Sequence, residues 1–216
     1  MEEWRLRFLE FAVRREALKF GEFTLKSGRK SPYFFNAGSF NTGDDLLEVG
    51  RAYAQAIVDS KIEFDVLFGP AYKGIPLAAA AALALAQFHG KSFPYAFNRK
   101  EAKGHGDKGL IVGFPLTPGC KVLVLDDVIT AGTAIRETTE LMKSLECEIA
   151  GVVISLDRQE KGATSDLSAI AEVKRDFGVP VVSMINLAHL IEYAKGKSEF
   201  AEVAPKMDAY RKEYGA

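Results

Sequence analysis

The expected fold follows from residues 122–134, VLVLDDVITAGTA. Four aliphatic residues begin this segment, which suits a strand that is buried on both faces, as in a parallel sheet. Two carboxylates, Asp126 and Asp127, come next, and a loop of small residues follows them. Side chains at helical spacing then recur at Ile135, Thr138, Met142 and Leu145. We therefore predict a strand, an acidic tip, a short loop and the start of a helix.

A helix that begins directly after such a loop is a suitable place for a phosphate. Its unpaired N–H groups and positive dipole end attract an anion, Thr130 and Thr133 can donate hydroxyl hydrogen bonds, and Gly132 permits close approach of the backbone. Asp126 and Asp127 would repel a phosphate, so they make sense if they face sugar hydroxyls or a bound cation of the same ligand. A ribose 5-phosphate fits this pattern. The alternative is a solvated turn capped by Asp and Thr.

A second unit of the same kind lies earlier in the chain. We expect a short buried strand at residues 64–68, a glycine-containing loop at 69–74, and an alanine-rich helix with Pro76 in its first turn. Lys73 adds a positive charge to this loop, where a second anionic group could bind. The alternative is an ordinary strand-to-helix turn with a solvated lysine.

Residues 98–109 contain four basic residues, one histidine and three glycines, and almost nothing apolar. Such a segment cannot pack a core, so we expect a long mobile loop after a strand at residues 93–97. A mobile cationic loop beside a diphosphate would supply charge and exclude water. A solvated flexible hairpin is the alternative.

The rest of the chain continues the alternation of helices and strands. We expect a helix over 3–19, two short strands around a turn at 27–30, a helix from a cap at Asn41 or Thr42 to Ser60, a strand at 149–156, a helix at 166–177, a strand at 179–185, and helices at 187–195 and 199–213. Ligands of open α/β sheets gather at the carboxyl ends of the strands. Arg158 follows strand 149–156 and could pair with a carboxylate through two hydrogen bonds.

Composition places the chain among ordinary globular proteins. The 216 residues suffice for one well-buried domain, and the net charge of −1 gives no general attraction to nucleic acid or membranes. Cys120 and Cys147 have no metal-ligand spacing, so we expect structural thiols in a reducing compartment. The N-terminal residues lack a secretion signal, and the apolar segment 75–86 is too short to span a bilayer. These features favour a cytoplasmic protein.

Residues 122–134 resemble the motif that binds phosphoribosyl diphosphate (PRPP) in type I phosphoribosyltransferases. Five segments together resemble the orotate phosphoribosyltransferase family across nearly the whole chain: 23–36, 68–76, 97–106, 126–134 and 155–160. The resemblance implies an α/β fold with a mainly parallel sheet flanked by helices. It also implies one domain over 1–216, in which residues 1–40 and the C-terminal elements form a hood over the base, and residues 98–110 form a mobile catalytic loop.

The resemblance further implies the reaction. The family transfers ribose 5-phosphate from PRPP to orotate, giving orotidine 5′-phosphate and pyrophosphate, in de novo pyrimidine (UMP) biosynthesis. It implies Mg²⁺ as cofactor and a homodimer as the working form. We expect Mg²⁺ to be held by substrate oxygens and water, with no direct protein ligand.

The family's site residues carry over onto matching positions. Phe34 and Phe35 are implied to lie along the pyrimidine, and Lys26, Thr130 and Arg158 to serve orotate or its surroundings. The residues implied to bind PRPP are Lys26, Tyr72, Lys73, Arg99, Lys100, Lys103, His105, Asp126, Asp127, Val128, Ile129, Thr130, Ala131, Gly132, Thr133 and Ala134. The implied catalytic groups are Lys100, Lys103, His105, Asp126 and Asp127, the first three reaching across the dimer into the neighbouring site.

Two alternatives remain open at this point. The first is a phosphoribosyltransferase for another base, against which Arg158 and the Phe34-Phe35 pair argue. The second is a PRPP-sensing regulator that binds nucleic acid and has lost catalysis. A net charge of −1 and an intact basic loop argue against this regulator.

Overall fold

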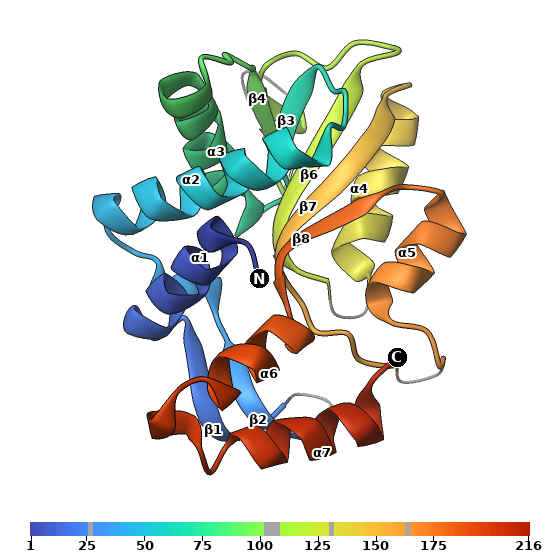
Figure 1. Cartoon of the computed structure of the whole chain (residues 1–216). Helices are drawn as coiled ribbons and strands as arrows, with labels where there is room; N and C mark the ends of the chain where they lie inside the picture. Colours follow the sequence, from blue (N-terminus) through green and yellow to red (C-terminus); the bar gives the residue numbers. More distant parts are fainter. Residues whose placement is uncertain (26–27, 102–108, 130–131, 163–164) are drawn as a thin grey trace.

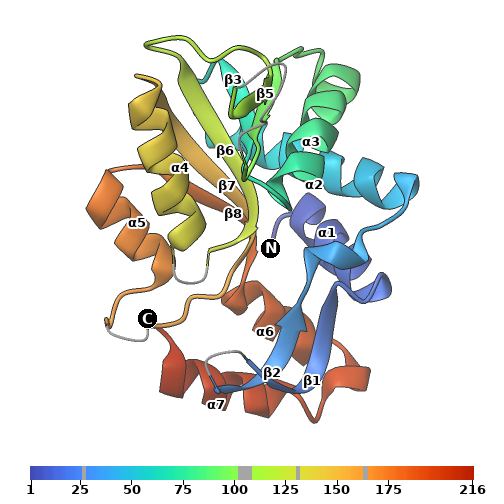
Figure 2. The same cartoon turned by 180° about the vertical axis from the view of Figure 1, so that it is seen from behind.

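The computed structural model describes residues 1–25, 28–101, 109–129, 132–162 and 165–216. A six-stranded sheet in the order β5-β4-β3-β6-β7-β8 runs through the larger part of the molecule (Figures 1 and 2). Its strands are β3 (Val66–Gly69), β4 (Tyr95–Asn98), β5 (Ile111–Gly113), β6 (Lys121–Val128), β7 (Glu148–Asp157) and β8 (Val181–Asn186). The edge strand β5 pairs antiparallel with β4, and the other pairings are parallel. The predicted α/β class with a mainly parallel sheet is confirmed.

Helices cover both faces of this sheet (Figures 1 and 2). They are α2 (Gly43–Ser60) and α3 (Gly74–His89) on one face, with α4 (Thr133–Ser144) and α5 (Ala169–Phe177) on the other. Strand β6 serves both layers, because Leu123 and Leu125 join the core under α2 and α3, while Val122 and Val124 join the core under α4. Burial on both faces explains why this strand is a continuous aliphatic run.

The smaller part of the molecule lies at one end of the sheet, below it in Figure 1. It contains α1 (Glu3–Arg14), the antiparallel pair β1 (Leu18–Thr24) and β2 (Lys30–Phe35), the short helix η1 (Ala37–Ser39), α6 (Leu187–Lys195), η2 (Ser198–Phe200) and α7 (Ala204–Tyr214). Aromatic contacts join its distant segments, since Phe20 lies 4.6 Å from Phe200 and Tyr33 lies 6.1 Å from Tyr210, between ring centroids. We call this part the hood; that it covers the base remains a prediction.

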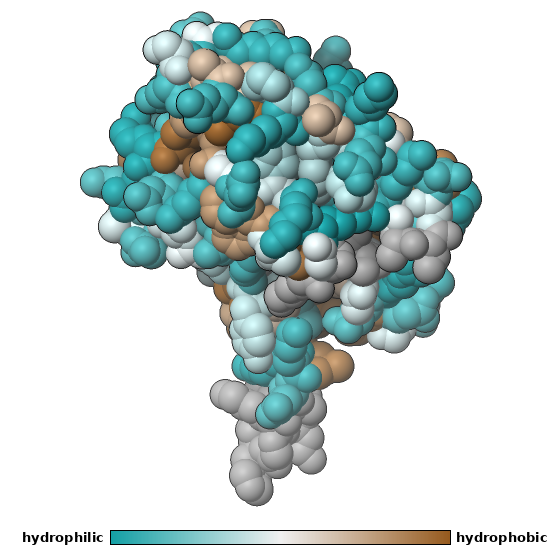
Figure 3. Space-filling model, turned by 90° about the horizontal axis from the view of Figure 1, so that it is seen from below, coloured by the Kyte–Doolittle hydropathy of each residue, from teal (hydrophilic) through white to brown (hydrophobic). Residues whose placement is uncertain are grey.

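Seen from below, the molecule presents a mostly hydrophilic face with small apolar patches (Figure 3). Among the residues that the structure describes, no helix combines the length and apolar character needed to cross a bilayer.

Several expectations about local structure were wrong in detail. The helix expected at 166–177 begins only at Ala169, and the helix expected at 199–213 is the short helix η2 followed by α7. The first helix ends at Arg14 rather than residue 19, because Glu16 takes a positive φ of 55° and Leu18 already pairs with Phe35 in the hood sheet. Strand β5 was not expected. Asp126 and Asp127 lie inside β6 rather than on an acidic tip beyond it, and both are buried.

Candidate functional site

The topology indicates where a ligand binds. Parallel neighbours β3 and β6 lie at the centre of the sheet, and the chain leaves β3 towards β4 on one side and β6 towards β7 on the other. Such a reversal opens a crevice at the carboxyl ends of the strands. A pocket of about 680 Å³ lies there, and its lining includes Asn98, Arg99, Lys100, Asp126, Val128, Ile129, Gly132, Thr133 and Ala134. The structure thus brings most of the described motif residues together in one cavity.

The two carboxylates at the end of β6 differ in their partners. Asp126 Oδ1 accepts the Asp127 backbone N–H at 2.9 Å, and Asp127 Oδ1 accepts the Val128 N–H at 2.9 Å. Asp127 Oδ2 also lies 2.6 Å from Lys73 Nζ, which comes from the loop after β3. Lys73 therefore spans the crevice between the two central strands.

The environment of Asp126 favours its neutral form. Burial opposes its ionisation, and the charge of Asp127 adds to the effect, so that the pKa of Asp126 rises from 3.8 to about 7. Below this strand end, the buried Tyr53 hydroxyl lies 2.6 Å from the Asp126 carbonyl oxygen, to which it donates, and 2.8 Å from Ser155 Oγ. Sequence reasoning missed Tyr53, which reaches the site from α2, and no local pattern distinguishes it from any other core tyrosine.

The loop after β3 is held by close packing. A Cβ atom on Gly69 would lie 2.1 Å from the Gly74 carbonyl oxygen, and one on Gly74 would lie 2.6 Å from Pro70 Cδ, so both positions require glycine. The Ala71 N–H donates to Asn98 Oδ1 at 2.9 Å, which ties this loop to the end of β4. Tyr72 is 70% exposed within it.

The basic residues after β4 border the same crevice. Lys100 Nζ lies 5.5 Å from the centroid of the Tyr72 ring. Arg99 donates from Nη1 to the Gly109 carbonyl at 2.8 Å, so its side chain bridges the two ends of the loop between β4 and β5. Lys103 and His105, predicted to lie in this loop, fall outside the described residues.

The predicted phosphate loop leads into α4 as expected. Gly132 has a φ of +70°, a conformation that favours glycine, and α4 begins at Thr133. The Gly132 carbonyl accepts the Arg136 N–H at 2.9 Å in the first turn of the helix. Thr130 and Ala131, both predicted to contact the phosphate, lie outside the described residues.

The residues predicted to contact the base fall into different environments. Phe34 is 41% exposed and stacks on Phe23 at 5.6 Å, whereas Phe35 is 8% exposed and packs in the hydrophobic core. The alternation along β2 explains this difference, because successive side chains point to opposite faces. The predicted contact of Phe35 with a base stays a prediction. Lys26, also predicted to serve the base, lies outside the described residues.

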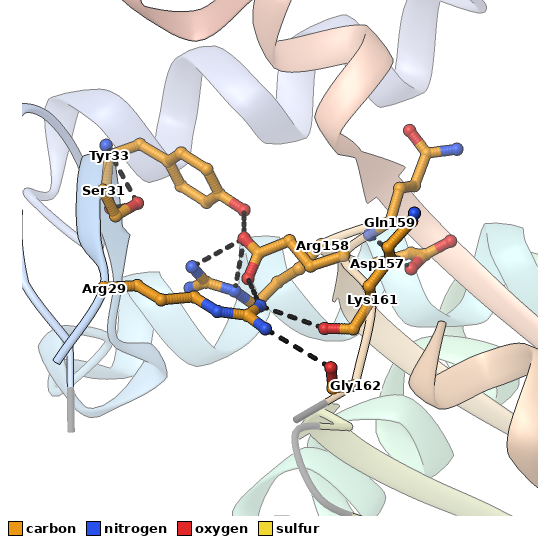
Figure 4. Close-up of polar contacts among 9 residues, drawn as sticks. Arg29, Ser31, Tyr33, Asp157, Arg158, Gln159, Lys161 and Gly162 are labelled. Carbon is orange, nitrogen blue, oxygen red and sulfur yellow. Dashed lines mark hydrogen bonds and ion pairs between the residues drawn. The ribbon is translucent and has the colours of Figure 1, made fainter. Parts of the chain in front are cut away.

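Arg158 is partly buried beside the hood and faces the carboxylate of Glu160 (Figure 4). Its Nε and Nη2 lie 3.0 and 2.8 Å from Oε1 of Glu160, and its guanidinium carbon lies 4.8 Å from the centroid of the Tyr33 ring. Burial opposes the positive charge, but Tyr33 and Glu160 more than offset this effect, so the pKa of Arg158 is raised. Sequence reasoning assigned no role to Glu160 or Tyr33, although both stand inside segments that resemble the family.

Comparison with known proteins agrees with this geometry. Residues 37–181 match the model of the phosphoribosyl transferase domain. The chain is 58% identical to orotate phosphoribosyltransferases of Klebsiella pneumoniae (strain 342) and Salmonella typhi, over the full length of both chains in each case. It superposes on the crystal structure of orotate phosphoribosyltransferase from Francisella tularensis with a TM-score of 0.89 and 48% identity, over 97% of this chain and 100% of that one. The chain belongs to the orotate phosphoribosyltransferase family.

Proposed function

We propose that the crevice between β3 and β6 is where this enzyme transfers ribose 5-phosphate from PRPP to orotate, giving orotidine 5′-phosphate and pyrophosphate for pyrimidine biosynthesis. The observation that carries this proposal is the meeting of three features in one pocket. These features are Asp126 at the end of β6, the N-terminus of α4 and the basic residues after β4; Asp127, the next residue along β6, pairs with Lys73. Each suits a different part of PRPP, namely the ribose hydroxyls, the 5-phosphate and the diphosphate.

In this proposal the loop from Val128 to Ala134 binds the 5-phosphate, and Asp126 and Asp127 accept hydrogen bonds from the ribose hydroxyls. Lys73 lies 2.6 Å from Asp127, which supports a role for its charge in binding the diphosphate next to the ribose. The residues proposed to bind the diphosphate side are Lys26, Tyr72, Lys73, Arg99, Lys100, Lys103 and His105.

The chemistry requires pyrophosphate to leave C1 of the ribose, where positive charge develops. Lysine, arginine and histidine side chains around the diphosphate offset the negative charge on the leaving group. Orotate N1, held as an anion in line with the breaking bond, attacks C1 with inversion. Neither step needs a covalent protein nucleophile. Lys100, Lys103 and His105 are the proposed catalytic cations, with Asp126 and Asp127 holding the ribose.

We propose Mg²⁺ as the cofactor. The described residues contain no group of three or more His, Cys, Asp or Glu side chains that could hold a metal ion by themselves. The acid pair nevertheless fits a hydrated cation that is carried by substrate oxygens, the arrangement Mg²⁺ prefers. When bound, Mg²⁺ neutralises charge on the diphosphate.

For the base, we propose that Phe34 and Phe35 lie along the pyrimidine ring, with Lys26 and Thr130 nearby. Arg158 would bind the orotate carboxylate. A partly buried, permanently charged guanidinium at the carboxyl end of β7 supports this assignment, because such a group pairs well with a carboxylate through two hydrogen bonds.

We also propose a homodimer in which the loop carrying Lys100, Lys103 and His105 serves the neighbouring site. Large apolar side chains are exposed on α3, on β4 and just after β5, at Leu83, Tyr95 and Phe114. The Phe114 N–H donates to the Tyr95 carbonyl at 3.0 Å, so these two residues are adjacent at the edge of the sheet. Exposed apolar surface of this kind is typical of protein interfaces. The loop between β4 and β5 leaves from the same edge.

A cytoplasmic location is proposed because Cys120 and Cys147 are both buried, free thiols, as expected in a reducing compartment.

The test is the loss of orotate absorbance with PRPP and Mg²⁺, with uracil, hypoxanthine and adenine assayed in parallel. Turnover of orotate alone is expected. Turnover of another base instead would contradict the proposed carboxylate-reading role of Arg158. PRPP binding without turnover of any base would favour the nucleic-acid-binding regulator.

A further inference from the structure

Glu160 lies just beyond β7, where three segments of the chain meet. Its Oε1 accepts the Tyr33 hydroxyl at 2.8 Å and the Arg158 Nε–H at 3.0 Å, and its Oε2 lies 3.8 Å from Arg29 Nη1. Its side chain is only 10% exposed. Figure 4 shows Tyr33 and Arg29 of the hood pointing towards Arg158 across this junction. One buried carboxylate therefore joins the hood to the strand that carries Arg158.

Glu160 is shared by two arginine side chains of the described residues. Two guanidinium groups, those of Arg29 and Arg158, face this single carboxylate. Arg29 is additionally fixed by donating to the carbonyl oxygens of Lys161 and Gly162, at 3.0 and 3.4 Å. Arg158 can pair with a second carboxylate, as guanidinium groups commonly do through their free N–H donors.

The contacts of Arg158 leave one edge of its guanidinium for such a carboxylate. Glu160 Oε1 accepts a hydrogen bond from Nε and lies 2.8 Å from Nη2, which makes no hydrogen bond of its own among the described residues, and the Tyr33 ring covers one face of the group. In the described part of the chain, no hydrogen bond engages Nη1. A planar guanidinium that is fixed along one edge and one face can present its remaining nitrogen in a single direction.

The loop that carries Glu160 is itself anchored by the end of the chain. The Lys161 N–H donates to the Tyr214 carbonyl at 2.8 Å, and the Ala216 N–H donates to the Gln159 carbonyl at 3.0 Å. Gln159 Oε1 accepts the Ala188 N–H at 3.0 Å, at the start of α6. Glu160 therefore has a fixed backbone from which to hold Arg158.

We propose that Glu160 is a positioning residue, which orients Arg158 towards the carboxylate of the base. Because Glu160 also contacts Tyr33 and Arg29, the orientation of Arg158 depends on the position of the hood. The inference rests on the role proposed above for Arg158. It adds that the base carboxylate is bound by a guanidinium whose direction is set by a second, permanent carboxylate. Removal of the Glu160 charge leaves the Arg158 side chain in place but less well oriented, so binding of the base weakens more than binding of PRPP.

The test compares Glu160→Gln, Tyr33→Phe, Arg158→Ala and the double variant Arg158→Ala/Glu160→Gln by steady-state kinetics. Glu160→Gln is expected to raise the KM for orotate about 10-fold, with the KM for PRPP unchanged within about twofold. Tyr33→Phe removes only one hydrogen bond to Glu160, so it is expected to change the KM for orotate in the same direction by a smaller factor. In the Arg158→Ala background, Glu160→Gln is expected to have no further effect, since it acts through Arg158.

Glu22→Gln is the matched control, because Glu22 pairs with Lys206 at 2.7 Å on the outside of the hood. It should leave both KM values unchanged. The positioning role would be overturned if Glu160→Gln changed the KM for orotate by the same factor in the wild type and in Arg158→Ala. It would also be overturned if the KM for orotate were unchanged in both Glu160→Gln and Tyr33→Phe. An unchanged KM for orotate in Arg158→Ala would instead refute the proposed role of Arg158, and this inference with it. Should Glu160→Gln fail to fold, Tyr33→Phe and its combination with Arg158→Ala give the same comparison.

Discussion

Asp126 shows at the scale of one residue how a binding site can oppose folding. Its carboxyl group is buried beside Asp127, and its ionised form gains only one described backbone hydrogen bond at 2.9 Å. Both burial and the neighbouring charge favour the neutral acid, which raises the pKa to about 7. Perturbed acids of this kind cluster at functional sites, where a ligand supplies the compensation that the free protein lacks.

The pKa of Asp126 predicts a pH dependence of stability. The folded-state value of about 7 lies above the ordinary 3.8, so ionisation favours the unfolded chain as pH rises from about 4 to about 7. A difference of about three pH units between the two pKa values means that ionisation of Asp126 lowers the free energy of unfolding by at most about 4 kcal/mol. Asp126→Asn should therefore unfold at higher urea concentration than the wild type at pH 8, with a much smaller advantage at pH 4.5. Exposed Asp59→Asn is the control, and an advantage equal at both pH values would contradict the prediction.

Individual site residues differed in how far the sequence could predict them. The places of Asp126, Asp127 and Gly132 near the end of one strand and in the turn that follows it could be predicted because these features are local, while their roles stay predictions. Tyr53 and Glu160 could not, because their roles depend on partners 73 residues away and 127 residues away in the chain, Asp126 and Tyr33 respectively. Contacts of this range are set by the packing of whole elements, and no spacing in the sequence reports them.

Elements were predictable where capping or periodicity was strong. Helix α2 begins at Gly43 after the expected cap at Thr42, and it ends at Ser60 as predicted. The first helix was predicted five residues too long because Leu18 continues its apolar pattern. That residue is instead recruited into β1 by pairing with β2, a tertiary effect that overrides local preference. Strand β5 has only three residues and is formed by pairing with β4, so its own sequence is too short to predict a strand.

Helix α2 offers a prediction about stability. Asp45 Oδ2 accepts the N–H groups of Asn41 and Thr42 at 3.1 Å and pairs with Arg15, the residue at the end of α1. Asp45→Ala should lower the free energy of unfolding by about 1–2 kcal/mol, because it removes the Asp45 half of the capping box and the ion pair with Arg15. Asp44→Ala, an exposed acid in the same turn, should cost less than about 1 kcal/mol. Urea unfolding followed by circular dichroism measures both, and equal losses would contradict the assigned role of Asp45.

The loop between β4 and β5 offers a prediction about catalysis. If the charge of Lys103 acts on the leaving pyrophosphate, Lys103→Ala should lower kcat by about 100-fold or more, with PRPP affinity largely unchanged. Lys91→Ala, an exposed lysine before β4, is the control and should keep wild-type kcat. Unchanged turnover in Lys103→Ala would exclude this role, and an equal loss in PRPP affinity would assign Lys103 to binding rather than to the transition state.

At the scale of the whole molecule, the order of strands explains why the separate motifs act together. Central strands β3 and β6 place the Lys73 loop beside the acid pair, and β7 brings Arg158 beneath the hood from the same edge of the sheet. The class of fold was predictable from alternating helices and strands, since short right-handed connections leave few arrangements. How the hood sits on the sheet was not predictable, because it depends on Tyr33, Arg29 and Glu160 meeting across the whole chain.

The proposed dimer makes the last prediction, which concerns two inactive chains. Lys103→Ala and Asp127→Ala each disable every site of their own homodimers. If the loop works in the neighbouring site, a heterodimer of the two has one site with both residues intact, and an equal mixture should recover roughly a quarter of wild-type activity after random exchange. If each loop serves its own site, no heterodimer site is intact and no activity is recovered.

The reciprocal control mixes wild type with the double variant Lys103→Ala/Asp127→Ala. There the neighbouring-site arrangement leaves roughly a quarter of all sites active, and the own-site arrangement leaves roughly half. Native mass spectrometry of differently tagged chains verifies that subunits exchange. If exchange is verified, catalysis across the dimer would be refuted by two results together: no activity in the mixture of the two single variants, and about half of wild-type activity in the control mixture.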